Sequence, residues 1–298
     1  MAQLALFWHP ARASCAAAKE FLGEHEVSFE SLNVRGDGEQ HWIAMGRPIV
    51  PSLVVDGRVV PILHVSQIAN VLGLPAPAHG DASRLAVDTV DLLRAWIELV
   101  RGLSLQELCA PTPARGRSLR NLTVNVAHPF ELLPEAWATG VFPWRPEDDE
   151  LRERELQIAE QVVSYAERRY ERWSAFVSEL GAELDRSSRR VSSPRGEIGW
   201  PDLVDQQRWH VAFHYRQLVA VLDDCGLVHS SPLPLELLEG SSFPSRASSS
   251  SRRKHACDRL PLRHGTAIRA ARIAPRITAP CSLVRDERVL RIARRWAQ

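Results

Sequence analysis

The chain has 298 residues, of which 45% are hydrophobic and 24% are charged, and these values are typical of a soluble globular protein of two modest domains. No run of 18 apolar residues occurs, and the N-terminus lacks a basic region followed by a long apolar run, so neither a membrane-spanning helix nor a secretory signal is expected. The cysteines are scattered, which favours free thiols in the cytoplasm over a disulfide framework: Cys15, Cys109, Cys225, Cys257 and Cys281.

The net charge of +1 conceals a basic tail. Residues 241–298 contain 14 basic and 3 acidic residues, whereas the rest of the chain contains 23 basic and 33 acidic residues. The tail shows no regular spacing of apolar residues and is expected to be disordered. Nucleic-acid binding is not expected, because the tail lacks interleaved aromatic residues and the rest of the chain is acidic. A shifted reading frame in a GC-rich gene would produce the same abrupt change, and this origin stays open.

Residues 1–75 alternate between strand-like and helix-like segments. The pattern predicts strands at 4–8 and 27–34, two further strands within 51–60, and helices at 15–25, 36–45 and 65–73. Asp56 and Gly57 form a strong hairpin signal between the last two strands. The order βαβαββα predicts a layered α/β domain with one crossover pair.

Residues 74–82, LPAPAHGDA, are typical of a linker, and only helices are expected after them. The expected helices span residues 83–103, 118–138, 148–180 and 201–225. Four amphipathic helices with two long connections favour a four-helix bundle over residues 83–230.

Three histidines suggest a metal site. His210 and His214 are four residues apart in WHVAFHYRQLVAVL and therefore lie on one helix face, while His128 belongs to another expected helix. Three imidazoles would hold a divalent metal with an open position, as in catalytic zinc sites, although nickel and iron suit imidazole equally well. The simpler reading is that the histidine pair is an accident of an amphipathic helix.

Residues 4–73 resemble glutaredoxins and the wider thioredoxin fold through HPARASCAAAKEFL and RPIVPSLVVDG. The resemblance aligns Cys15 with the resolving cysteine, whereas Arg12 stands where the nucleophilic cysteine would be. It aligns Pro51 with the family's cis-proline and Val50 with the residue whose backbone contacts a bound thiol peptide. Because Arg12 cannot attack a disulfide, we expect no ordinary reductase activity, but its guanidinium could contact a carboxylate of glutathione.

Residues 83–230 resemble the DinB-like family of helical bundles through RSLRNLTVNVAHPFELL and QQRWHVAFHYRQL. The resemblance implies that His128, His210 and His214 bind a divalent metal, and that the chain could form a homodimer, since such bundles often pair. Glu131, three residues after His128, is a candidate for a general base, a partner of a metal ligand or an exposed helix residue. The expected neighbours of the site are Trp209, which also suits bundle packing, Arg216 and Gln217.

Both resemblances imply a protein that uses low-molecular-weight thiols. We therefore expect a metal-dependent transferase that uses a low-molecular-weight thiol, such as glutathione, against an electrophilic substrate. Three alternatives stay open: a glutaredoxin-like oxidoreductase, a metal-dependent hydrolase or isomerase, and a stress-response binding module without catalysis.

Overall fold

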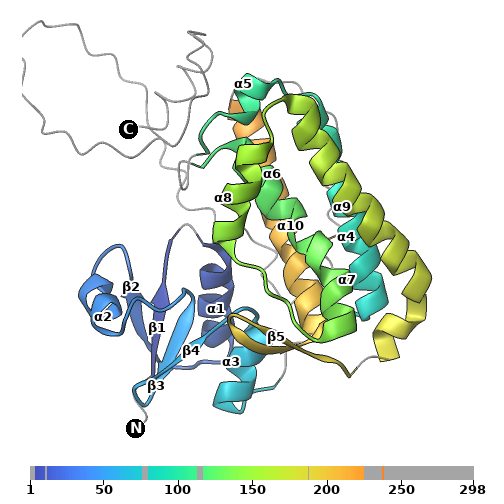
Figure 1. Cartoon of the computed structure of the whole chain (residues 1–298). Helices are drawn as coiled ribbons and strands as arrows, with labels where there is room; N and C mark the ends of the chain where they lie inside the picture. Colours follow the sequence, from blue (N-terminus) through green and yellow to red (C-terminus); the bar gives the residue numbers. More distant parts are fainter. Residues whose placement is uncertain are drawn as a thin grey trace, which may run out of the picture.

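The computed structural model describes residues 4–10, 12–75, 80–112, 117–186, 188–224 and Leu237, which form two adjoining regions (Figure 1). The first is an α/β region with a mixed four-stranded sheet, and the second is mostly helical. The tail expected at 241–298 lies outside the described residues, as does the end of the last expected helix at Cys225. None of the helices in the described ranges combines the length and apolar character needed to cross a membrane.

The α/β region has the element order expected from the sequence: β1 (Leu4–Trp8), α1 (Ala13–Glu24), β2 (Glu30–Asn33), α2 (Glu39–Ala44), β3 (Ser52–Val55), β4 (Arg58–Pro61) and α3 (Val65–Leu72). The strands lie side by side in the order β2-β1-β3-β4. β1 is parallel to β2 and antiparallel to β3, and β4 is antiparallel to β3. Helix α1 makes the crossover that the parallel pair requires.

Alternating side chains of β1 enter two different cores. Leu6 packs with Leu22 of α1 and Ile68 of α3 on one face of the sheet, whereas Phe7 packs with Val50 on the other face. Such alternation is the consequence of the two-residue repeat of a strand. The apolar run at 4–8 is therefore explained by burial of β1 on both faces.

The turn between β3 and β4 confirms the hairpin expected at Asp56 and Gly57. Their φ angles are 50° and 79°, and positive φ at both central residues is what a type I′ hairpin turn requires. The peptide bond between Val50 and Pro51, just before β3, is cis.

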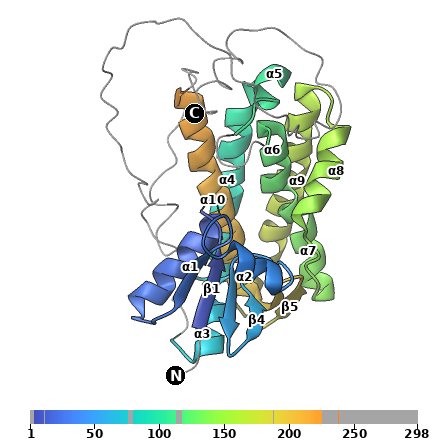
Figure 2. The ribbon, with the colours of Figure 1, turned by 90° about the vertical axis from the view of Figure 1, so that its left-hand side faces the viewer.

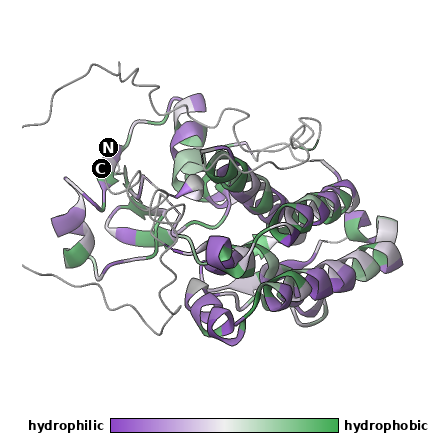
Figure 3. Cartoon of the chain, turned by 90° about the horizontal axis from the view of Figure 1, so that it is seen from above, coloured by the Kyte–Doolittle hydropathy of each residue, from purple (hydrophilic) through white to green (hydrophobic). Residues whose placement is uncertain are grey.

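The second region consists of α4 (Ala82–Arg101), α5 (Leu105–Leu108), α6 (Leu119–Ala127), α7 (Pro129–Thr139), α8 (Pro146–Glu155), α9 (Ala159–Leu180), the 3₁₀ helix η1 (Gly181–Arg186) and α10 (Trp200–Asp224). Seen from above in Figure 3, apolar and polar residues alternate around these helices. Helix α4 packs against both α9 and α10, and its Trp96 is completely buried in the shared core together with Trp173 of α9.

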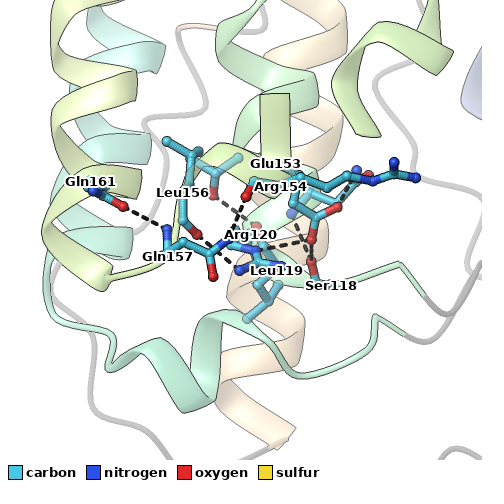
Figure 4. A network of polar contacts seen from close by, with 10 residues as sticks. Ser118, Leu119, Arg120, Glu153, Arg154, Leu156, Gln157 and Gln161 are labelled. Atoms are coloured by element: carbon cyan, nitrogen blue, oxygen red, sulfur yellow. Dashed lines mark hydrogen bonds and ion pairs between the residues drawn. The ribbon is translucent and has the colours of Figure 1, made fainter. Parts of the chain in front are cut away.

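Two of the expected helices are each divided in two. The helix expected at 118–138 is interrupted at His128, because Pro129 has no N–H to donate and its ring displaces the preceding turn. The helix expected at 148–180 is interrupted where Leu156 and Ile158 adopt ψ angles of 89° and 158°. Arg120 then donates to the carbonyl of Leu156 at 3.0 Å, so this carbonyl at the end of α8 is satisfied (Figure 4).

The expectation that only helices follow the linker is wrong. Strands β5 (Arg190–Ser193) and β6 (Gly196–Gly199) form an antiparallel hairpin, and Gly196, the first residue of β6 after the turn, has a φ of 95°. Val191 and Ile198 face each other across the hairpin and are buried in the helical core. This short alternation of apolar and polar residues is a strand signal that the sequence analysis did not use.

The hairpin and α10 join the two regions. The side-chain amide of Gln67 on α3 donates to the carbonyls of Arg195 and Glu197 at 3.0 and 3.2 Å. His64 lies 3.3 Å from the Asp205 carboxylate of α10, and Trp209 packs against the α/β core. Figures 1 and 2 show the first turns of α10 and β5 next to the α/β region. The two regions are therefore in direct contact through buried groups.

Candidate functional site

Four buried polar side chains connect three helices in the interior of the helical region. Nδ1 of His128, at the junction of α6 and α7, lies 2.8 Å from Oδ1 of Asp149 on α8. The other oxygen of Asp149 accepts a hydrogen bond from the Asn125 amide of α6 at 2.7 Å. Oδ1 of Asn125 lies 3.1 Å from Nε2 of His210 on α10. We call these four residues the polar network.

The geometry of the polar network assigns its protons. An ionised carboxylate only accepts, so Nδ1 of His128 and the amide nitrogen of Asn125 both donate to Asp149. The oxygen of Asn125 then faces His210, whose Nε2 must be the donor. Each neutral ring keeps its lone pair on the other nitrogen, which is Nε2 in His128 and Nδ1 in His210.

His214 lies beside the polar network. Its ring centroid is 4.7 Å from that of His210, and its Nδ1 lies 2.9 Å from the side-chain oxygen of Gln217. Nη2 of Arg117 lies 3.3 Å from its Nε2. Because a guanidinium only donates, His214 accepts at Nε2 and donates from Nδ1 to Gln217. The ring of Trp144 packs on His210, with 5.6 Å between the centroids.

The structure thus gathers the three predicted metal ligands, His128, His210 and His214, in one part of the core. Within the described ranges, however, no group of three or more His, Cys, Asp or Glu side chains is arranged to hold a metal ion. The donor chemistry fits a metal, because a ring whose Nδ1–H is held by an oxygen presents Nε2 as a ligand, as in His128 and His214. Coordination by His214 would require Arg117 to turn away, so the metal site stays a prediction.

Helix α8 is fixed against α6 by charged hydrogen bonds that position Asp149. Glu153 accepts from Arg120 at 3.2 Å, from the Asn121 amide at 2.8 Å and from the hydroxyl of Ser118 (Figure 4). Glu153 lies one turn after Asp149, so both carboxylates project from the same face of α8. The orientation of Asp149 toward His128 therefore does not depend on the Asp149–His128 contact alone.

Asp149 and Asn125 were missed by the sequence analysis. The signal that could have found them is a polar stripe on α6, where Asn121, Asn125 and His128 recur at spacings of four and three residues. The inward face of α8 carries the matching carboxylates, Asp149 and Glu153. Charged residues are costly on a buried helix face unless they are paired, so such stripes indicate a polar interior.

Glu131, the candidate general base, is held in an ion pair. One of its oxygens accepts from Nη2 and Nε of Arg169 on α9 at 2.6 and 3.1 Å. Burial acts to raise the pKa of Glu131, but the hydrogen bonds and charge of Arg169, with smaller effects of Arg152 and His128, lower the pKa below its usual value. Glu131 is therefore an anchored anion at neutral pH, and its part in catalysis stays a prediction.

The residues predicted to bind a thiol lie together at the beginning of α1. Nη1 of Arg12 donates to the carbonyl of Val50 at 3.0 Å, next to the cis bond of Pro51. Cys15 is 1% exposed, packs in the same core as Val50, and its Sγ accepts from the backbone N–H of His9 at 3.4 Å. A thiol so deeply buried is poorly placed to attack a disulfide in solution.

Comparison of the chain with models of protein families, with curated proteins and with solved structures found no match.

Proposed function

We propose that this protein is a metal-dependent transferase that joins a low-molecular-weight thiol, such as glutathione, to a small electrophilic substrate. In this proposal residues 1–75 are a thioredoxin-like domain, and residues 83–230 are a four-helix bundle similar to DinB-like proteins. The observation that carries the proposal is the buried pair of His128 and Asp149, which Asn125 extends to His210. Metal-binding histidines usually donate the ring N–H that faces away from the metal to a carboxylate, a backbone carbonyl or water, and Asp149 would be such a partner for His128.

The proposed ligands are His128, His210 and His214. Asp149 and Gln217 would hold the first and last of these rings by Nδ1, which keeps them neutral and oriented. A bound divalent metal would favour the thiolate form of a nearby thiol, so no strong protein base is required. The surrounding residues contribute a buried environment, in which the interactions of charges are less screened by water.

The proposed thiol site is formed by Arg12, Val50 and Pro51, with Cys15 packed behind them. Among the described residues Val50 accepts one N–H of the Arg12 guanidinium, which has five N–H groups. Its remaining N–H groups suit a carboxylate of glutathione, with which a planar guanidinium forms paired hydrogen bonds.

Metal binding tests the first part of the proposal. Titration calorimetry with Zn²⁺ and Ni²⁺, together with metal analysis of the purified protein, should show one metal ion per chain. His128→Ala and His214→Ala should each lose most of the affinity, whereas His41→Ala, which removes an exposed histidine of α2, should bind like the unmodified protein. Full metal binding by the double variant His210→Ala/His214→Ala would contradict the assignment.

Activity assays separate the proposed transferase from its alternatives. Glutathione-dependent consumption of an electrophile such as 1-chloro-2,4-dinitrobenzene, lost in His214→Ala, is the expected result. Substrate turnover without thiol would indicate a hydrolase or isomerase instead. Reduction of a mixed disulfide at the rate of a dithiol glutaredoxin would indicate an oxidoreductase, and is not expected because Arg12 occupies the position of the nucleophile. Ligand binding without any turnover would indicate a binding module.

A further inference from the structure

One nitrogen of the proposed metal ligand His214 is engaged by a side chain from outside its helix. Nη2 of Arg117, the residue before the Ser118 cap of α6, lies 3.3 Å from Nε2 of His214 on α10. His214 is buried and Arg117 is half-buried. The other ring nitrogen, Nδ1, lies 2.9 Å from the side-chain oxygen of Gln217. Arg117 therefore contacts the ring nitrogen that the proposed metal would need.

The backbone of Arg117 is anchored at the beginning of α6. Its carbonyl accepts from the N–H of Thr112 at 2.7 Å, and the next residue, Ser118, forms an antiparallel bridge with Pro111. The hydroxyl of Ser118 accepts from the N–H of Asn121 at 2.9 Å and so caps α6. The guanidinium, in contrast, stands at the end of a stem with several rotatable bonds. Rotation of the Arg117 side chain can therefore release His214 while α6 stays folded.

The contact of Arg117 and coordination of a metal exclude each other at Nε2 of His214. This nitrogen has one lone pair in the plane of the neutral ring, and a guanidinium, which only donates, occupies it. A metal ligand must offer the same lone pair. The positive charge of Arg117 also opposes a divalent cation at the same position.

We propose that Arg117 competes with a divalent metal for Nε2 of His214, so that its side chain regulates the loading of the metal site. This inference rests on the proposed function, because it takes His214 to be a metal ligand. The contact is present only in the metal-free form of the protein. By linkage, the factor by which it stabilises that form is the factor by which it lowers the metal affinity. The same contact can therefore be measured in two independent ways.

The first measurement is calorimetric titration of the full chain with Zn²⁺. Arg117→Met keeps an unbranched apolar stem but removes the guanidinium, so it should bind Zn²⁺ about tenfold or more tightly than the unmodified protein, the scale of one charge-assisted hydrogen bond. Arg154→Met removes an exposed arginine of α8 and is the matched control for the loss of one positive charge. It should bind Zn²⁺ like the unmodified protein.

The second measurement is urea unfolding in the presence of a chelator, which requires no metal. Arg117→Met should raise the unfolding equilibrium constant by about the same factor as it raises the Zn²⁺ affinity. In the His214→Ala background the contact is already absent, so adding Arg117→Met should change the unfolding constant little. An equal loss of stability in both backgrounds would show that the stability of Arg117 comes from other contacts, and would overturn the proposal.

The outcomes separate this inference from the proposed function. If the unmodified protein binds Zn²⁺, His214→Ala does not, and Arg117→Met binds like Arg154→Met, the competition is wrong and the metal site stands. If neither the unmodified protein nor Arg117→Met binds Zn²⁺, both proposals are wrong. Binding of Zn²⁺ by Arg117→Met alone would support the competition in its strongest form.

Discussion

Asp149 offers the sharpest test of the polar network. Its carboxylate accepts two buried hydrogen bonds, from His128 at 2.8 Å and from Asn125 at 2.7 Å. In Asp149→Asn the shape is retained, but only one terminal atom can accept, so one of the two donors faces another N–H group. A hydrogen bond to a charged group contributes about 1.5–3 kcal/mol, so we expect a loss of about 2 kcal/mol in the free energy of unfolding. In Asp149→Ala both donors lose their acceptor, and about 2–6 kcal/mol is expected, because each buried donor left unsatisfied costs about 1–3 kcal/mol.

Urea unfolding followed by tryptophan fluorescence and circular dichroism measures both losses. Glu150→Gln is the matched control, because the neighbouring Glu150 is exposed and its replacement should change stability by less than about 0.5 kcal/mol. If Asp149→Asn is as stable as Glu150→Gln, the Asp149 carboxylate contributes nothing as a double acceptor, which would contradict its role in the polar network.

Three further predictions concern other parts of the chain. Gln67→Ala should lower the free energy of unfolding by about 2–6 kcal/mol, because it removes the two amide bonds to the hairpin and the two bonds that Oε1 accepts from the backbone N–H groups of Leu63 and His64, whereas the exposed Asn70→Ala should not. Desolvation raises the pKa of Tyr165 from 10.0 to about 12. The stability that its protonated hydroxyl contributes is therefore complete below pH 10 and is lost as pH rises toward 12. Absorbance at 295 nm should show one phenol that ionises at a higher pH than the other tyrosines, and Tyr165→Phe should lack this phenol. If His128, His210 and His214 bind metal as neutral rings, calorimetric affinity should fall below about pH 6.5, and a pH-independent affinity would contradict that ligand set.

Local patterns were sufficient to predict the α/β region. The apolar run at 4–8, the Asp56-Gly57 turn and the glycine that ends α3 each act within a few residues of the chain. They therefore predicted the order βαβαββα before any contact between distant segments was known. The same holds for the four-residue spacing of His210 and His214, which brings their rings to 4.7 Å on one face of α10.

The pairing of helix faces was decided only by the tertiary structure. The sequence shows Asn125, His128 and Asp149 as polar residues, but it does not show that α6 and α8 turn these residues toward each other. It likewise does not show that Arg117 reaches His214, because the two residues are 97 positions apart. Nor did periodicity reveal the break at residues 156–158, where Arg120 of another helix satisfies the released carbonyl. Residue patterns predict which face of a helix is apolar, whereas the partner of a buried polar group depends on which faces meet when the whole chain packs.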